Sequence, residues 1–186
     1  LVGSEMCIRD SNDMGPKLFG NIVLMIVLVL AQVLVCNRIM LFGMAVAFVF
    51  IYVVVSLPMK LKTDWLLTWA FVSGLLVDVF VDTPGVNALS CTLLAMMKKP
   101  VLYAYIPRDD HTKNVVPSLS TLGFAVYAKY LLTMSALYCV MVFTIEYFSF
   151  ASVKEIVIMS AASAVLTFLI LLAIDSLIIS RREKRL

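Results

Sequence analysis

Charged side chains are scarce in this sequence. Of its 186 residues, 15% are charged and 62% are hydrophobic. An ordinary soluble domain is about one quarter charged and about half apolar, so the composition excludes that class. The apolar residues gather in long blocks, which is typical of helices that cross a bilayer. We therefore expect an all-α integral membrane protein that is surrounded by the lipid bilayer.

Residues for common catalytic and metal chemistry are scarce as well. His111 is the single histidine and lies in a charged connection, and the four cysteines form no C-x-x-C pattern. The chain contains no H-E-x-x-H, no G-x-S-x-G and no Gly-rich phosphate loop. Cys36, Cys91 and Cys139 lie in or beside apolar blocks, where thiols behave as small apolar side chains. We expect no enzymatic activity, no catalytic residue, no metal, no cofactor and no nucleic-acid partner.

The first residues of the chain do not fit the rest. Residues 1–13 (LVGSEMCIRDSND) are polar and unpatterned, and they look like translated sequencing adaptor. We expect the native chain to begin at Met14, with 14–186 as one transmembrane domain. A short disordered tail is the alternative interpretation of the leader.

A helix needs about 20 apolar residues to cross the hydrocarbon core. The sequence offers six such stretches, at roughly 18–36, 39–57, 65–81, 86–106, 120–145 and 155–180. Lys98, Lys99 and Pro100 interrupt the fourth stretch, so a five-span arrangement remains open.

The distribution of basic residues predicts the orientation of the spans, because cytoplasmic connections carry an excess of Lys and Arg. With six spans, one side of the membrane receives Lys17, Lys60, Lys62, Lys98, Lys99, Arg108, Lys113, Arg181, Arg182, Lys184 and Arg185. The other side receives Arg38 and Lys154. We therefore expect both termini in the cytoplasm.

Two carboxylates stand out at the end of the third stretch. Gly74, Asp78 and Asp82 are spaced i, i+4 and i+8, which places them on one helix face. Gly74 allows close approach of another backbone, and Pro84-Gly85 suits the centre of a type II turn. The next helix then begins beside Asp82, whose charge its first amides favour. This predicts a helical hairpin with a polar lock at the outer face; an ion or substrate site is the alternative.

Two opposite charges lie inside the last two apolar stretches. Lys129 is in the fifth stretch and Asp175 is in the sixth, and both fall in the predicted cytoplasmic half. Opposite charges in a membrane tend to pair, so we expect an intramembrane charge pair. The alternative is that each side chain reaches the inner surface separately.

One short pattern crosses the predicted hairpin. It consists of Gly74, Leu75, Asp78, Phe80, Pro84, Gly85, Asn87, Ala88 and Leu89. This pattern resembles the signature of the rod shape-determining protein MreD family. Pro107 to His111, Gly123 to Tyr130 and Glu146 to Phe150 resemble one branch of that family.

The resemblance implies a non-enzymatic subunit of the bacterial elongation machinery in the inner membrane. It implies partnership with MreC, with the actin-like filament MreB, and with the transglycosylase and transpeptidase of lateral wall synthesis. It also implies a likeness in fold to the substrate-binding subunits of energy-coupling-factor transporters.

Such a transporter subunit is the rival functional interpretation. Those subunits resemble one another in a small-residue A-x-x-x-A-type face on the first helix. The stretch 18–36 (LFGNIVLMIVLVLAQVLVC) contains one alanine and no such face, which favours the scaffold subunit.

Overall fold

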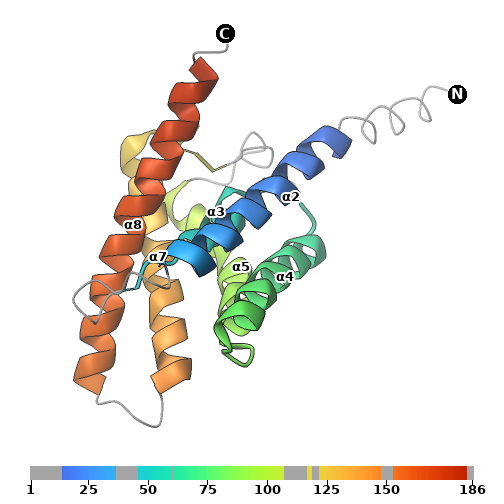
Figure 1. The fold of residues 1–186 in the computed structure, drawn as a ribbon. Coiled ribbons are helices and arrows are strands. Elements are labelled where there is room, and N and C mark those ends of the chain that lie inside the picture. Colours follow the sequence, from blue (N-terminus) through green and yellow to red (C-terminus); the bar gives the residue numbers. More distant parts are fainter. Residues whose placement is uncertain are drawn as a thin grey trace, which may run out of the picture.

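The computed structural model describes residues 14–36, 46–59, 61–106, 117–118, 122–147 and 153–183. Within these ranges every regular element is a helix (Figure 1). The leader 1–13, the charged connection 107–116 and the last basic residues 184–186 lie outside the described residues.

The helices follow the predicted stretches closely, with one exception. They are α2 (Met14–Ala31), which continues into the π-helical turn η1 (Gln32–Cys36), the 3-10 turn η2 (Val49–Ile51), α3 (Tyr52–Ser56), α4 (Thr63–Val81), α5 (Val86–Tyr105), α7 (Phe124–Tyr147) and α8 (Val153–Glu183). α5 continues through Pro100 as one helix.

Among the residues that the structure describes, three helices are long and apolar enough to cross a membrane. They are α4, the Phe124–Glu146 part of α7 and the Val153–Ile178 part of α8, and Ile22–Leu34, which runs from α2 into η1, is a shorter apolar helix. These lengths are compatible with a helical membrane protein.

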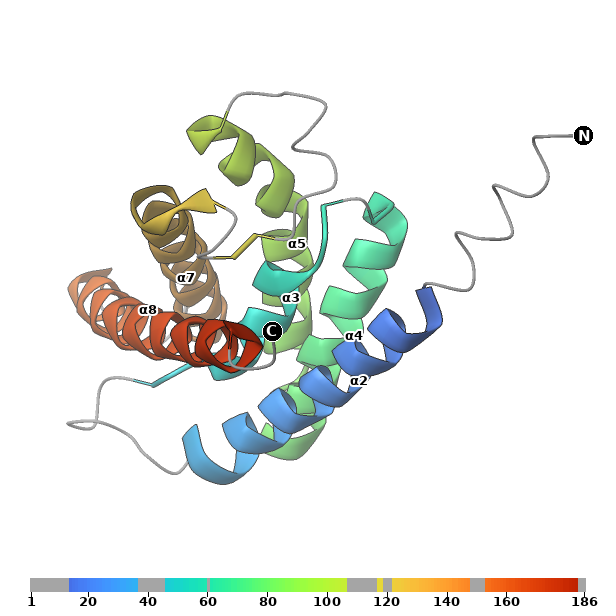
Figure 2. The same ribbon diagram turned by 90° about the horizontal axis from the view of Figure 1, so that it is seen from above.

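Two helical hairpins form the body of the fold. α4 packs against α5, α7 packs against α8, and α5 joins the two pairs by packing on α7. α2 crosses in front and contacts α4 and the segment that contains η2 and α3 (Figure 1). Seen from above, α3 lies in the middle of the surrounding helices (Figure 2).

The exception is the predicted span 39–57. In its described part, 46–48 is not helical and is followed only by the short turns η2 and α3. Phe50, Ile51, Val54 and Val55 are fully buried. The prediction of a continuous helix there was wrong, because an apolar run satisfies a central core position as well as it satisfies a lipid-facing span.

The non-helical backbone at 46–48 and the first residue of η2 are hydrogen-bonded by side chains of other helices. In an apolar interior every unpaired amide is costly, so such backbone is tolerated only where partners are supplied. The partners come from η1 and α8, whose polar side chains here are buried. The bonds are Gln32 Nε2 to the Ala47 carbonyl (2.9 Å), Val49 N to Gln32 Oε1 (2.8 Å), Val46 N to Ser163 Oγ (3.1 Å) and Phe48 N to Thr167 Oγ1 (3.1 Å).

Candidate functional site

Asp78 forms the centre of a polar lock between α4 and α5. Its side chain is buried, and both carboxylate oxygens are occupied. Oδ1 accepts hydrogen bonds from Thr83 Oγ1 (2.7 Å), Asn87 Nδ2 (2.9 Å) and the Asn87 amide (3.0 Å), and Oδ2 accepts one from the Ala88 amide (2.8 Å). A carboxylate on α4 therefore caps the N-terminus of α5, whose first amides lack partners within their own helix.

Gly74 allows the two helices to approach closely enough for this contact. A Cβ atom built at Gly74 would lie 2.6 Å from the Ala88 Cα atom and 2.6 Å from the Asn87 carbonyl oxygen. Both are backbone atoms, so they cannot move without moving α5. The close approach that the sequence predicted at Gly74 is present.

The turn between the helices uses two left-handed residues. Asp82 ends α4 with φ 56° and ψ 29°, and Gly85 precedes α5 with φ 78° and ψ 7°. The left-handed φ at Gly85 suits glycine, which has no Cβ to clash there. The Gly85 amide donates to the Thr83 carbonyl at 2.8 Å, which is the i to i+2 bond of a γ-turn centred on Pro84 rather than the i to i+3 bond of the type II turn that we expected.

The structure gives the capping role to Asp78 rather than to Asp82. We predicted that Asp82 would lie beside the first amides of α5, but its side chain is exposed. The left-handed backbone at Asp82 takes this residue out of the helical register that would have placed it below Asp78. Periodicity alone therefore misplaced the second carboxylate.

The lock extends from the hairpin into α7. The Tyr138 hydroxyl donates to Asn87 Oδ1 at 2.6 Å. Tyr138 is fully buried, and its ring makes edge contacts with Phe48 (centroids 5.1 Å apart) and Phe50 (5.8 Å apart). Tyr138 and Thr83 were not predicted from the sequence to belong to the lock. A tyrosine in the middle of an apolar helix was a usable signal, because a buried hydroxyl needs a partner.

Leu75 and Phe80 have no part in the lock. Their side chains are 41% and 57% exposed on the outer surface of the hairpin. Of the remaining pattern residues, Gly74, Asp78 and Asn87 are buried between the two helices, and Pro84 and Gly85 form the turn. Leu75 and Phe80 therefore lie where lipid or another membrane helix can contact them.

The structure does not bring Lys129 and Asp175 together. The side chain of Lys129 is exposed, whereas Asp175 is buried on α8. Asp175 Oδ1 accepts a hydrogen bond from the Tyr52 hydroxyl at 2.7 Å. Lys129 lies on the face of α7 opposite to the buried residues Tyr127 and Met134. The prediction used only the depth of each charge in the membrane, and depth does not say which way a side chain points.

Lys98 lies inside the fold rather than at its surface. Its side chain is fully buried, and Nζ donates to the Val54 carbonyl (2.8 Å) and the Leu57 carbonyl (2.5 Å) at the end of α3. The neighbouring Lys99 donates to Thr63 Oγ1 at 3.1 Å and is less buried. Lys98 thus donates to the carbonyls at the C-terminal end of α3, as lysine side chains do near helix C-termini.

We expect Lys98→Met to destabilise the fold by about 1–3 kcal/mol, because two buried carbonyls lose a charged donor. Lys99→Met is the matched control at the adjacent position, and its effect should stay below about 1 kcal/mol. The free energy of unfolding in mixed detergent measures both. Equal losses for the two variants would argue against a specific cap at Lys98.

The geometry of the lock decides what it can do chemically. A general base needs an accessible carboxylate oxygen within reach of the proton it removes. Both oxygens of Asp78 are instead occupied by donors from the turn and from α5. The arrangement holds two helices at a fixed distance and angle and presents their outer surface.

Comparisons of the chain with protein-family models, curated proteins and solved structures find no match.

Proposed function

We propose that this chain is a non-enzymatic scaffold subunit of the bacterial cell-elongation complex, of the MreD type, in the inner membrane. In this role it binds MreC and links cytoskeletal MreB to the transglycosylase and transpeptidase of lateral wall synthesis. The proposal includes six membrane passages, both termini in the cytoplasm, and a fold like that of energy-coupling-factor substrate-binding subunits.

The observation that carries the proposal is that some residues of the hairpin pattern hold the two helices together while others are exposed. Gly74, Asp78, Gly85 and Asn87 have internal structural tasks, whereas Leu75 and Phe80 face outward. This pattern holds the hairpin rigid and leaves apolar side chains exposed. Both properties suit a subunit that acts by presenting a binding surface to partner proteins. The full occupation of Asp78 supports a scaffold rather than an enzyme.

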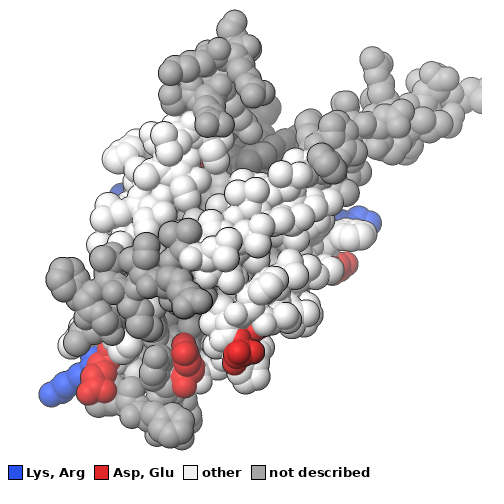
Figure 3. Space-filling model, viewed as in Figure 1, with Lys and Arg blue, Asp and Glu red and all other residues white. Residues whose placement is uncertain are grey.

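The distribution of charge supports the proposed orientation. Exposed acidic residues gather over the end of the molecule where both hairpins turn (Figure 3). They are Asp82, Glu146 and Glu155. Lys154 is the one Lys or Arg among the described residues at this end, and a shortage of basic residues is what the positive-inside rule expects on the outer side.

Co-purification of the chain with MreC from bacterial membranes tests the proposal. We expect the native chain to capture MreC. The double variant Leu75→Ala/Phe80→Ala should capture about tenfold less MreC, because it lacks two large apolar side chains of the kind that anchor interfaces. Both side chains are exposed, so the fold should persist.

The control is Val165→Ala/Leu169→Ala on α8, where the side chains are 53% and 57% exposed. It should leave capture unchanged. Failure of the native chain to capture MreC would reject the scaffold proposal. Tight binding of a small vitamin-like compound by the purified chain would instead favour the transporter subunit.

A further inference from the structure

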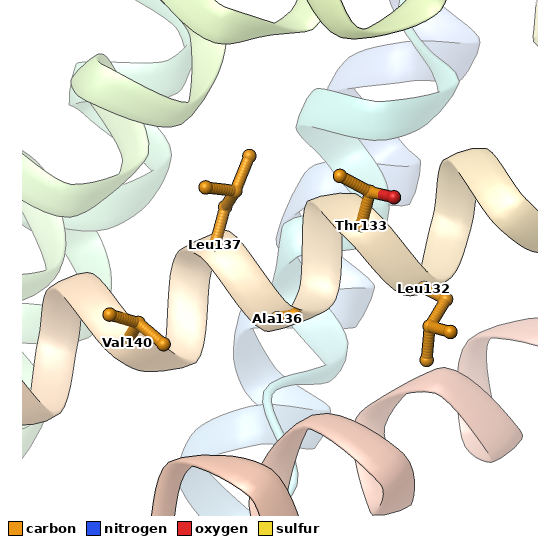
Figure 4. A pocket seen from close by; sticks show the side chains of 5 residues that line it. All are labelled: Leu132, Thr133, Ala136, Leu137 and Val140. Atoms are coloured by element: carbon orange, nitrogen blue, oxygen red, sulfur yellow. The ribbon is translucent and has the colours of Figure 1, made fainter. Parts of the chain in front are cut away.

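A shallow hollow runs along the outward face of α7, between α5 and α8. It encloses about 360 Å³, and its lining is almost entirely apolar: Leu132, Thr133, Ala136, Leu137 and Val140 (Figure 4). Thr133 and Leu137 point toward the side of α5, while Leu132 points toward the side of α8 (Figure 4). The small Ala136 lies between them and forms the floor.

One end of this α7 hollow is polar. Lys129 precedes Thr133 by one turn, and positions 129, 133, 136 and 140 share one helix face. The Lys129 side chain is exposed, and no carboxylate forms an ion pair with it among the residues that the structure describes. Tyr105, at the end of α5, places its hydroxyl 2.8 Å from Thr133 Oγ1. Thr133 Oγ1 also donates to the Lys129 carbonyl at 2.8 Å. Lys129 and the two hydroxyls therefore belong to the N-terminal end of the hollow.

The hollow is short enough to lie within one leaflet of a bilayer. From Leu132 to Val140 the helix rises about 12 Å, and one leaflet takes about half of the ~30 Å hydrocarbon core. Helical side chains extend toward the helix N-terminus. The Lys129 ammonium group thus reaches toward the membrane surface at which α7 begins.

We propose that the α7 hollow binds an anionic phospholipid of the leaflet in which α7 begins. One acyl chain lies over Ala136 and Leu137, and the phosphate binds the Lys129 ammonium group, with the Tyr105 and Thr133 hydroxyls beside the glycerol esters. An exposed cation at interface depth beside an apolar hollow complements this class of lipid, as basic pockets between membrane helices do for acidic head groups. The predicted orientation makes this the cytoplasmic leaflet. The inference does not depend on the proposed scaffold function.

Photolabelling in nanodiscs tests this inference. The chain is reconstituted in phosphatidylcholine with a trace of phosphatidylglycerol that carries a photoreactive acyl chain, or with phosphatidylcholine that carries the same group. We expect labelling of α7 at 132–140 to be about fivefold higher with the anionic lipid, since one basic side chain near the surface contributes about that preference. Lys129→Gln should abolish the preference, and Lys129→Arg should keep it.

Controls separate this site from general lipid contact. Ala136→Phe, which fills the floor, should remove the label from α7, whereas Ala162→Phe at an exposed position of α8 should not. Equal labelling by the two lipids, or a preference that survives Lys129→Gln, would overturn the inference. So would a crosslink from position 136 to a second copy of the chain or to another membrane helix, because the hollow would then be a protein interface.

Discussion

Replacing Asp78 with leucine is expected to lower the free energy of unfolding by about 3–5 kcal/mol, because buried donors at the start of α5 lose their acceptor. Four hydrogen bonds end on this carboxylate, from Thr83, Asn87 and Ala88. The same variant should lose MreC capture, since the hairpin surface depends on the lock. Unfolding in mixed detergent and co-purification measure the two effects.

Asp78→Asn separates the shape of the side chain from its charge. An asparagine oxygen can replace Oδ1, but its amide group would then face the Ala88 amide, which now donates to Oδ2. We expect an intermediate loss of about 1–3 kcal/mol. Asp82→Asn is the matched control, because Asp82 is exposed and asparagine tolerates its left-handed backbone. If Asp78→Leu were as stable as the native chain, the lock would not hold the hairpin.

Gly74→Ala is expected to destabilise the hairpin by about 1–2 kcal/mol, although alanine is the better helix former. The helical preference favours alanine by about 1 kcal/mol. The added methyl group would lie 2.6 Å from the backbone of α5. Overpacking of this kind destabilises by more than the helical preference stabilises. The two helices must separate, which also lengthens the hydrogen bonds of Asp78.

Gly20→Ala provides the control for this substitution. A Cβ at Gly20, in α2, would meet nothing within 4 Å, so the same change should be neutral or stabilising by up to about 1 kcal/mol. The two variants are compared in the same unfolding assay. A Gly74→Ala protein as stable as the Gly20→Ala protein would show that α4 and α5 do not approach as closely as described.

Much of the fold could be predicted from the sequence because long apolar blocks and turn residues are local signals. The limits of α4 and α5 and the turn between them follow from hydrophobic length and from Pro84-Gly85. The close approach at Gly74 follows from helical spacing. Asp78 could be recognised as part of a lock because a carboxylate in an apolar helix needs buried partners.

The same local signals misjudged residues whose partners are distant in sequence. Lys98 was counted among the basic residues of the cytoplasmic surface, but it caps α3 from within the fold. The stretch 39–57 had the composition of a span, yet its backbone at 46–49 is held by Gln32, Ser163 and Thr167. Apolar composition reports that a segment avoids water, and it does not distinguish lipid from the protein core.

The sequence by itself determined the helical class, the hairpin and the presence of a polar lock, because these depend on residues close together in the chain. Only the tertiary structure decided which carboxylate caps α5, that Tyr138 joins the lock, and that Lys129 faces outward while Asp175 faces inward. The physical reason is that a hydrogen bond or a charge contact depends on direction as well as depth. The direction of a side chain is set by helix rotation and by single turn residues such as Asp82, which spacing alone does not specify.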